Sequence, residues 1–529
     1  MIRIRQINVN LDNDTLENVY KKAANRLRIK QEEILDLKIM KKSLDARHKP
    51  NLFYIYEVDV KVKDEDRILK YNKDKDILAS NYEPYKFNVT GTKNNAKIVI
   101  VGAGPAGLMA SYILAENGYK PLVIERGEDV DRRVKTVEQF FLTNKLNTES
   151  NVQFGEGGAG TFSDGKLTTQ VKDPFKRKQK VLETLVKAGA DDNIVYINKP
   201  HIGTDKLRDV VKNIRNIAIK NGASYRYNTK LTNLIIENNE LKAIEVNNKE
   251  IIECNVLILA IGHSARDTFY MLNDKINMEA KPFAVGVRVQ HPQKLINKSQ
   301  YGIEFHELLE AASYKLTYNT QNKRGVYSFC MCPGGYVVNA SSEDGMLAIN
   351  GMSNHARESE NANSAIIVSV TPKDFGDKPL DGIEFQRNLE KKAYEIGKKY
   401  IPVQLLKDYK QNKESVKLGN INPIFKGKYN LANLNLIFPE YINESIKEAM
   451  DYYGNKIKGF NDGDVILAGV ESRTSSPVRM ERNELCESNI KGIFPCGEGA
   501  GYAGGITSSM MDGLKVSESI AQIYNNKEE

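Results

Sequence analysis

Residues 98–115 read IVIVGAGPAGLMASYILA, an uncharged stretch on which the fold prediction depends. Its length approaches that of a membrane-spanning helix, but the central Gly-Ala-Gly-Pro-Ala-Gly would break a helix in its middle. A strand over 97–101, a tight turn and a helix over 104–117 fit the pattern better. With a second strand over 121–125, the stretch predicts one βαβ unit of a parallel sheet.

Three glycines with the spacing G-x-G-x-x-G join the predicted strand to the predicted helix: Gly102, Gly104 and Gly107. The first permits the tight turn, the second lets the backbone approach a pyrophosphate, and the third lets helix and strand pack closely. The amides that open the helix direct roughly half a positive charge toward the phosphates. Glu125, at the end of the next strand, is placed to accept hydrogen bonds from a ribose. The pattern therefore predicts a Rossmann-type dinucleotide-binding domain.

Length and composition bound the rest of the molecule. A chain of 529 residues exceeds one compact core, and 41% hydrophobic with 27% charged residues is ordinary for globular domains. The net charge of +8 is a small difference between 76 basic and 68 acidic residues, so it is weak support for nucleic-acid binding. The odd count of five cysteines indicates a reducing compartment. Because the N-terminus has no apolar leader, we expect a cytoplasmic protein without membrane contact.

The chain divides into three predicted parts. Residues 1–90 form β-branched runs around one amphipathic stretch, which predicts a small N-terminal α+β module of βαββ type. Strand, glycine-turn and helix patterns over 96–274 recur over 465–525, so we expect a discontinuous nucleotide-binding domain. Residues 275–464 mix strands, Pro and Gly turns and Lys/Glu-rich helices. They predict an inserted α+β cap domain that holds a substrate, in a protein of the α/β class.

Two local patterns occur in the N-terminal module. The alternation of Ile2 and Ile4 slips by one residue before it resumes at Ile7. Asp14 and Glu17 have the N-cap and N3 spacing of a helix that begins at residue 15. No aromatic-glycine platform of the kind found in RNA-binding sheets occurs, so nucleic acid is not the expected partner.

Further motifs resemble those of known flavoproteins. Three segments resemble the FAD-binding segments of the two-dinucleotide-binding-domain flavoproteins: VIVGAGPAG at 99–107, LAIGHSARDT at 259–268 and GIFPCGEGAGYAGGITSSMMDG at 492–513. Four others resemble the bacterial family of uncharacterised FAD-dependent dehydrogenases: GEGGAGTFSDGKL at 155–167, MCPGGYVV at 331–338, INGMS at 349–353 and ESRTSSPVR at 471–479. The resemblance covers nearly the whole chain. It implies an FAD-dependent oxidoreductase with a glutathione-reductase-like FAD domain, although the family is not defined by one reaction.

The resemblance also implies which residues lie along FAD. They are Gly102, Ala103, Gly104, Pro105, Ala106 and Gly107 at the pyrophosphate, Glu125 and Arg126 at the adenosine ribose, Gly157, Gly158, Ala159, Gly160, Ser163 and Lys166 near the flavin ring, and Gly262, Gly497, Glu498, Gly504, Gly505 and Ile506 in the second and third segments. Glu498 stands where an acid usually holds the ribityl chain. The helix that follows Gly505 would direct its dipole at the flavin C2 carbonyl and raise the flavin potential.

No motif fixes a catalytic residue, and three candidates each have a structural alternative. His263 is either a neighbour of the flavin or a cap of the following helix. Cys332, with Cys330 two residues before it, is either a catalytic thiol or a core residue of a strand. Arg473 either acts in the site or forms an ordinary ion pair. Six histidines and five cysteines show no metal-ligand spacing, so no metal site is predicted.

The expected substrate is a small organic molecule with an anionic group, because basic residues occur in segments that flank the predicted flavin domain. These residues are Arg288, His291, Arg473 and Arg479. The leading hypothesis is hydride exchange between flavin N5 and this substrate or a nicotinamide. Since no second Rossmann unit is visible, either NAD(P)H binds at the cap as a transient reductant or the electrons come from elsewhere. Two alternatives stay open: a prenyl-lipid or other double-bond reductase, and a non-catalytic flavoprotein whose N-terminal module binds RNA or a protein. The sequence predicts no oligomeric state.

Overall fold

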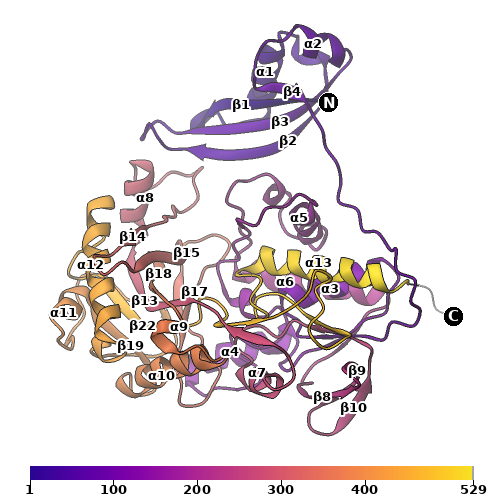
Figure 1. Cartoon of the computed structure of the whole chain (residues 1–529). Coiled ribbons are helices and arrows are strands. Elements are labelled where there is room, and N and C mark those ends of the chain that lie inside the picture. Colours follow the sequence, from indigo (N-terminus) through magenta and orange to yellow (C-terminus); the bar gives the residue numbers. More distant parts are fainter. Residues whose placement is uncertain (527–529) are drawn as a thin grey trace.

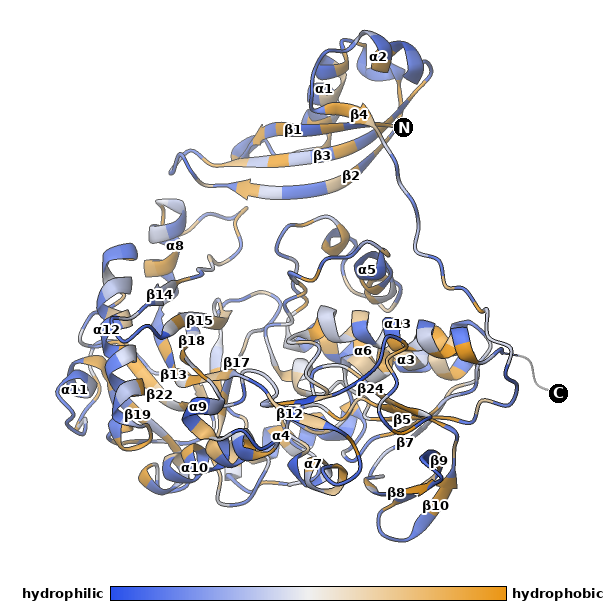
Figure 2. Ribbon diagram, in the orientation of Figure 1, coloured by the Kyte–Doolittle hydropathy of each residue, from blue (hydrophilic) through white to orange (hydrophobic). Residues whose placement is uncertain are grey.

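The computed structural model describes residues 1–526, which form three parts. Figure 1 shows the N-terminal module above the rest of the molecule, with an extended segment running from it to the second part. The second part contains the nucleotide-binding sheet, and the third is the cap. Hydrophobic residues concentrate in the strands of the two larger sheets and along α3 and α13 (Figure 2). Within residues 1–526, none of the helices combines the length and apolar character that a membrane crossing requires.

The N-terminal module is an antiparallel sheet of order β2-β3-β1-β4 with two helices. Its elements are β1 (Ile2–Asn10), α1 (Leu16–Leu27), β2 (Ile34–Asp45), β3 (Phe53–Val62), α2 (Glu65–Tyr71) and β4 (Ile77–Ala79). The βαββ prediction therefore missed α2 and β4. Helix α2 has no buried residue, so its sequence carries no apolar periodicity from which it could be read.

Both local patterns of the module have a structural counterpart. The slipped alternation is a bulge in β1, where the register with β3 shifts between Ile4 and Ile7 and both side chains are still buried. The capping prediction was wrong by one residue. Thr15 is the N-cap of α1, and its hydroxyl accepts a hydrogen bond from the amide of Asn18. Asp14 instead binds the Lys42 ammonium group at 2.5 Å.

The nucleotide-binding domain has the expected βαβ unit and a five-stranded parallel sheet of order β24-β11-β5-β6-β7. Its strands are β5 (Ile98–Val101), β6 (Leu122–Ile124), β7 (Ser224–Arg226), β11 (Val256–Leu259) and β24 (Ile493–Pro495). Its helices are α3 (Pro105–Glu116), α4 (Val130–Thr143), α5 (Arg177–Lys187), α6 (Thr204–Lys220), α7 (Arg266–Leu272) and α13 (Ile506–Ile523). Helix α3 lies against both α6 and α13. A three-stranded meander of β8 (Leu231–Glu237), β9 (Glu240–Val246) and β10 (Glu250–Glu253) leads back to β11. The predicted α/β architecture with a Rossmann-type domain is confirmed.

The cap is built on a seven-stranded sheet of order β14-β15-β18-β13-β22-β19-β21, in which only β19 and β21 run parallel to each other. The strands are β13 (Phe283–Pro292), β14 (Thr317–Asn319), β15 (Gly325–Cys332), β18 (Asn361–Val370), β19 (Ile401–Leu405), β21 (Tyr429–Leu431) and β22 (Ile466–Glu471). Helices α8 (Gln293–Tyr301), α9 (Pro372–Phe375), α10 (Asp381–Ile396), α11 (Leu406–Lys410) and α12 (Glu440–Lys456) surround it. A smaller sheet joins β16 (Tyr336–Asn339), β17 (Ile349–Met352) and β20 (Phe425–Lys426).

Strand β22 lies in the cap, whereas the sequence analysis placed residues from 465 onward in the nucleotide-binding domain. It pairs with β13 and β19. Two short strands, β12 (Met278–Ala280) and β23 (Val478–Met480), then pair, and the chain rejoins the nucleotide-binding sheet at β24. All six residues of β22 are buried, and a short apolar run of this kind does not reveal which sheet receives it.

Candidate cofactor and substrate cavity

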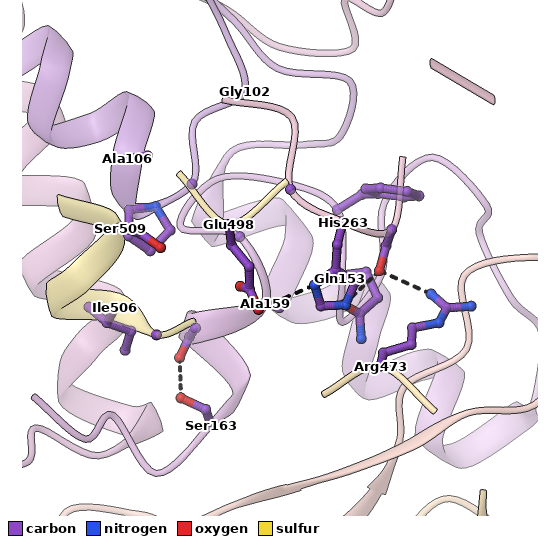
Figure 3. A pocket seen from close by; sticks show the side chains of 18 of the residues that line it. Gly102, Ala106, Gln153, Ala159, Ser163, His263, Arg473, Glu498, Ile506 and Ser509 are labelled. Carbon is purple, nitrogen blue, oxygen red and sulfur yellow. Dashed lines mark hydrogen bonds and ion pairs between the residues drawn. The ribbon is translucent and has the colours of Figure 1, made fainter. Parts of the chain in front are cut away.

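A cavity of about 390 Å³ runs from the turn between β5 and α3 to the ends of cap strands β15, β17 and β22. It is bounded by backbone loops on the nucleotide side and by polar side chains on the cap side. Figure 3 shows part of its lining, with Gly102 and Ala106 near the start of α3 and Arg473 on the cap side.

The turn between β5 and α3 has the geometry that an anionic ligand requires. A Cβ atom at Gly107 would lie 1.9 Å from the carbonyl oxygen of Gly102, so strand and helix meet there without room for a side chain. Helix α3 begins at Pro105 after Gly104, and no side chain caps its first amides. Because Gly104, Pro105 and Ala106 line the cavity, this helix terminus is open to a phosphate group.

A second glycine loop packs directly against the first. Gly157 donates its amide to the carbonyl of Ala103 at 2.8 Å. Gly158 has a φ of 61°, and a Cβ atom there would lie 3.1 Å from the Cα of Gly104. Two backbone segments therefore approach as closely as glycine allows, and they form one continuous wall of the cavity.

Arg133 of α4, which was not among the predicted site residues, organises the second glycine loop. Its side chain is fully buried, and burial lowers the pKa of Arg133 to about 10. The guanidinium donates hydrogen bonds to backbone carbonyls of five residues, namely Asn151, Val152, Gly155, Glu156 and Gly158. No local motif signals this role, because the partners follow in the chain and are brought together only by the fold.

Glu125 also acts on the loops. Its carboxylate accepts hydrogen bonds from the amides of Ala103 at 2.8 Å and of Gly127 and Gly155 at 3.0 Å. Only 6% of the residue is exposed, but it lines the cavity. The oxygen Oε2 has one protein donor and keeps a further lone pair, so the carboxylate can both hold the turn and accept a ribose hydroxyl.

Arg126, also in the lining, is held between two acids and an aromatic ring. Its guanidinium forms hydrogen bonds with Asp267 at 2.8 and 3.0 Å and with Glu149 at 2.9 Å. It also lies over the ring of Phe154, 4.1 Å from the centroid. This arrangement gives the nucleotide end of the cavity a fixed, flat surface.

The C-terminal segment closes the same wall from the other side. Gly504, Gly505 and Ile506 line the cavity at the beginning of α13, where no side-chain cap is present. Glu498 extends toward His263, with Oε1 3.3 Å from Nδ1 (Figure 3). Within residues 1–526, both ring nitrogens of His263 lack a partner in good hydrogen-bond geometry, although only 8% of the residue is exposed.

Arg473 lines the cavity, but protein groups already occupy its guanidinium. Glu390 receives hydrogen bonds from Nε at 3.0 Å and from Nη2 at 2.8 Å. Nη1 donates to the hydroxyls of Ser264 and Ser342, and Ser264 in turn donates to Gln153. Burial alone would raise the pKa of Glu390, but Arg266 and Arg473 together lower it below its usual value. Arg473 therefore joins the cap to the nucleotide domain, and its charge is balanced.

Arg288 stands behind the cavity wall. It is fully buried and donates from Nε to Glu471 at 2.9 Å and from Nη1 to Asn363 at 2.7 Å. Glu471 and Asn350, to which Nη2 donates at 3.2 Å, do line the cavity. Arg288 thus presents a carboxylate and an amide to a ligand and does not reach the ligand itself.

The other two basic candidates lie away from the cavity. His291 is fully buried, stacks on Phe460 with a 4.1 Å centroid separation, and has a pKa lowered to about 4 by burial. It follows Arg288 by three residues in one strand, so the two side chains point to opposite faces. Arg479 has a side chain that is 43% exposed beside Glu279 on the paired strand. The alternation of β13 is the signal that could have separated Arg288 from His291.

The two cysteines occupy different environments. Cys332 is 1% exposed, its thiol donates to the carbonyl of Cys330 at 3.3 Å, and burial raises its pKa. Cys330 has a φ of 39° in a bulge of β15 and is open to the cavity. The cavity is deep, and burial raises the pKa of Cys330 to about 12. Both thiols are therefore protonated at neutral pH, which disfavours a catalytic thiolate.

Lys166 is a cavity-lining cation without a carboxylate of its own. Its ammonium group donates to the carbonyl of Met331 and stands 4.0 Å from Oδ2 of Asp164. Asp164 is already bound by Arg357 through two hydrogen bonds of 3.0 and 2.6 Å. Lys166 therefore contributes a net positive charge to the inner part of the cavity.

The structure brings most of the predicted cofactor residues to one cavity. Its lining contains Gly102, Gly104, Pro105, Ala106, Glu125, Arg126, Gly158, Ala159, Gly160, Ser163, Lys166, Gly262, Glu498, Gly504, Gly505 and Ile506. Four others are not part of this lining: Ala103, Gly107, Gly157 and Gly497. Of the catalytic candidates, His263, Cys332 and Arg473 line it as well. The cap-side residues Phe329, Cys330, Asn350 and Glu471 were not foreseen as part of a site.

Known families and proteins match this chain over different parts of its length. Residues 95–138 match the family described as an FAD binding domain, residues 282–474 match "FAD-dependent protein, C-terminal domain-like", and residues 1–61 match a domain of unknown function. An uncharacterised protein of Clostridium beijerinckii is 48% identical over 99% of both chains. A digeranylgeranylglycerophospholipid reductase of Methanocaldococcus jannaschii is 35% identical over 14% of this chain and 20% of its own. The L-proline dehydrogenase of P. horikoshii has a TM-score of 0.37 and 11% identity, over 81% of this chain and 92% of that one.

The fold and the matched domains define a class. The chain has a Rossmann-type FAD-binding domain with two opposed glycine loops, and this domain is joined to a cap domain. This arrangement defines an FAD-dependent oxidoreductase. Within this class, the chain belongs to the bacterial family of FAD-dependent proteins that includes its C. beijerinckii relative.

Proposed function

We propose that this protein is an FAD-dependent dehydrogenase or reductase that exchanges a hydride with an organic substrate held against the cap. The observation that carries the proposal is the continuity of one cavity, from the open amides of α3 to the Glu471 and Asn350 side chains. When bound, FAD supplies the hydride chemistry at its N5 atom. The residues around it bind, orient and exclude water.

The assignment of residues to FAD follows the shape of the cavity. The Gly102–Gly107 turn and the open end of α3 suit the pyrophosphate, and Glu125 with Arg126 suits the adenosine end. The close contact of Gly158 with Gly104 leaves a thin backbone wall where a flat ring can approach. Glu498 is placed for a ribityl hydroxyl, with His263 as its neighbour.

The substrate assignment rests on a balance of charges. Arg288 and Arg473 are neutralised by Glu471 and Glu390, so neither is free to bind an anion. Lys166 has no carboxylate of its own, and we assign it to an anionic group of the substrate or to the electron-rich edge of the reduced flavin. Hydrogen-bond donors of a substrate would meet Glu471 on the cap side.

Anaerobic reduction of the FAD-loaded protein by NADH and by NADPH tests the proposal. Rapid bleaching of the flavin absorbance band by either reductant is the expected result. If neither bleaches the band within minutes while dithionite does, the nicotinamide-linked version of the proposal fails. A screen of small organic anions as direct reductants would then decide whether a substrate-reduced dehydrogenase remains.

A second candidate is a prenyl-lipid or other double-bond reductase, which the local match to the archaeal lipid reductase favours. It would require an apolar cap wall. The observed wall contains Asn350 and Glu471, backed by Arg288 and Asn363, and a long hydrocarbon would leave these groups without partners. Reduction of a polyprenyl substrate by the dithionite-reduced protein would support this candidate, and its absence together with turnover of a polar acid would exclude it.

A further inference from the structure

Across the described residues 1–526, backbone hydrogen bonds join the N-terminal module to the rest of the molecule at one place, besides the covalent linker. The amide of Lys42 in edge strand β2 donates to the carbonyl of Tyr196 at 2.8 Å, and the amide of Asn198 donates to the carbonyl of Lys42 at 2.9 Å. These bonds form a parallel bridge between Lys42 and Ile197. We call residues 196–203 the strap, because one end of this segment is bonded to the module and the other end to a loop of the cavity wall.

The other end of the strap is bonded to the cavity wall. We call residues 164–167 the cavity loop. Within it, the amide of Leu167 donates to Pro200 at 2.9 Å, and the carbonyl of Gly165 accepts from Ile202 at 3.1 Å. The pair Lys166 and His201 forms an antiparallel bridge. The strap thus makes one isolated β-bridge near each of its ends, and its partner at the second bridge carries the Lys166 side chain of the cavity.

Little free space separates the strap from the cavity loop. A Cβ atom on Gly165, whose φ is 69°, would lie 2.9 Å from the amide nitrogen of Gly203. His201 is 7% exposed, and its Nε2 lies 3.0 Å from the carbonyl oxygen of His355 in the cap. Because the strap is hydrogen-bonded to the cavity loop and the close approach of Gly203 to Gly165 leaves no free space, we expect a shift of the strap to move the cavity loop.

On the module side, the Lys42 side chain is bound within the module itself. Its ammonium group binds Asp14 at 2.5 Å and lies over the ring of Tyr54, 4.1 Å from the centroid. The other module contacts are single side-chain bonds to the cap, among them Tyr54 to the carbonyl of Leu308 at 3.3 Å and His306 to Asp12 at 3.2 Å. The backbone connection at Lys42 is therefore the most directional link between the module and the remainder.

We propose that the N-terminal module is a positioning element for the cavity, and that it acts through Lys42 and the strap to fix the cavity loop and Lys166. The functional part of this inference rests on the proposed function, because it takes Lys166 to face the flavin and its substrate. The structural part, that the module fixes the cavity loop through the strap, does not rest on the proposed function. It also gives the module a role that requires no nucleic acid and no protein partner.

The test removes one backbone donor and leaves the side chains of the cavity intact. Lys42→Pro deletes the amide that binds Tyr196 on an edge strand, where proline is tolerated. Lys42→Ala is the matched control, because it removes the contacts of the ammonium group and keeps the backbone bonds. Asn198→Pro breaks the second bond from the strap side and serves if Lys42→Pro does not fold.

Hydrogen exchange of the full chain gives a readout that is independent of turnover. In Lys42→Pro, amides of the strap and of the cavity loop are expected to exchange roughly tenfold faster than in the wild type, while the β8–β9 hairpin is unchanged. Lys42→Ala should leave the cavity loop as in the wild type. Faster exchange confined to residues 196–198 would overturn the proposal, because the strap would then not transmit the change.

The flavin potential tests the functional part. Lys166→Gln removes a cation from the cavity, so it should lower the midpoint potential of the bound flavin. Lys42→Pro should shift the potential in the same direction, and the double variant should shift it no further than Lys166→Gln alone. Additive shifts would contradict an action through Lys166. If the wild-type protein holds no FAD, the proposed function fails, while hydrogen exchange still decides on the strap.

Discussion

The two walls of the cavity are built in different ways. On the nucleotide side the wall is backbone, formed by the Gly102–Gly107 turn and the Gly155–Gly158 loop. On the cap side it is formed by side chains such as Glu471 and Asn350, each held by Arg288 from behind. The first wall is specified by residues that are close in sequence. The second depends on partners more than 60 residues apart, as Arg288 and Glu471 illustrate.

A substitution in the backbone wall should have the largest effect. In Gly107→Val, the side chain would collide with the carbonyl oxygen of Gly102, 1.9 Å from the Cβ position. We expect FAD affinity to fall at least about a hundredfold, because α3 can no longer approach β5. The flavin content of the purified variant measures this. Gly345→Ala is the control: the space around its Cβ position is open, and although a side chain at its φ of 73° costs about 1–2 kcal/mol of stability, the variant should remain yellow.

The side-chain wall should lose stability when one partner is removed. Arg288→Met leaves the buried Glu471 without its cation, and we expect a loss of about 3–5 kcal/mol in the free energy of unfolding by urea. Arg479→Met, at a half-exposed arginine, should cost less than about 0.5 kcal/mol. The double variant Arg288→Met/Glu471→Gln should recover much of the loss. Equal losses in the single and double variants would show that packing, and not charge, holds this wall.

His291, which lies behind the cap wall, should make the free energy of unfolding of the cap depend on pH. The pKa of His291 is lowered to about 4 by burial, so folding favours the neutral ring. Its contribution to stability is complete above the unfolded pKa near 6.5 and is lost as pH falls through 4. Relative to His291→Gln, the wild type should lose up to about 3 kcal/mol between pH 6.5 and 4. Urea unfolding at a series of pH values measures the difference, and parallel curves would contradict it.

Substitution of the cysteines of the cap wall should have the smallest effect, measured on flavin reduction. Because burial raises the pKa of Cys330 to about 12, the thiol stays protonated over the working range of an enzyme. We expect Cys330→Ser and Cys332→Ser to retain flavin reduction within about twofold of the wild type. A loss of a hundredfold or more in either variant, with FAD still bound, would restore the hypothesis of a catalytic thiol.

The difference between the walls also explains what could be predicted from the sequence. The first glycine turn, Glu125 and the βαβ unit follow from local patterns with a mechanical reason for each residue. Arg133 and Glu471 escaped prediction, because their roles depend on loops and strands that meet only after folding. The wrong assignment of β22 to the nucleotide domain had the same cause, since an apolar run does not show which strands will pair with it.

The direction in which side chains point was the second limit on prediction from the sequence. Arg288 and His291 were grouped because both are basic and close in sequence, yet a strand sends them to opposite faces. Arg473 lines the cavity, but its partner Glu390 lies in α10, far from it in the chain, and no pattern connects them. Residue type thus indicated the chemistry of the cap, while the fold decided which charged side chains remain available to bind a ligand.

Flavin stoichiometry of the purified wild-type protein tests the central claim most directly. The protein is denatured, and the released cofactor is identified by chromatography and compared with the amount of polypeptide. A wall of opposed glycine loops at the open end of α3 predicts FAD as the released cofactor, at close to one molecule per chain. Release of no flavin after reconstitution with excess FAD, or binding of FMN in preference to FAD, would contradict the account.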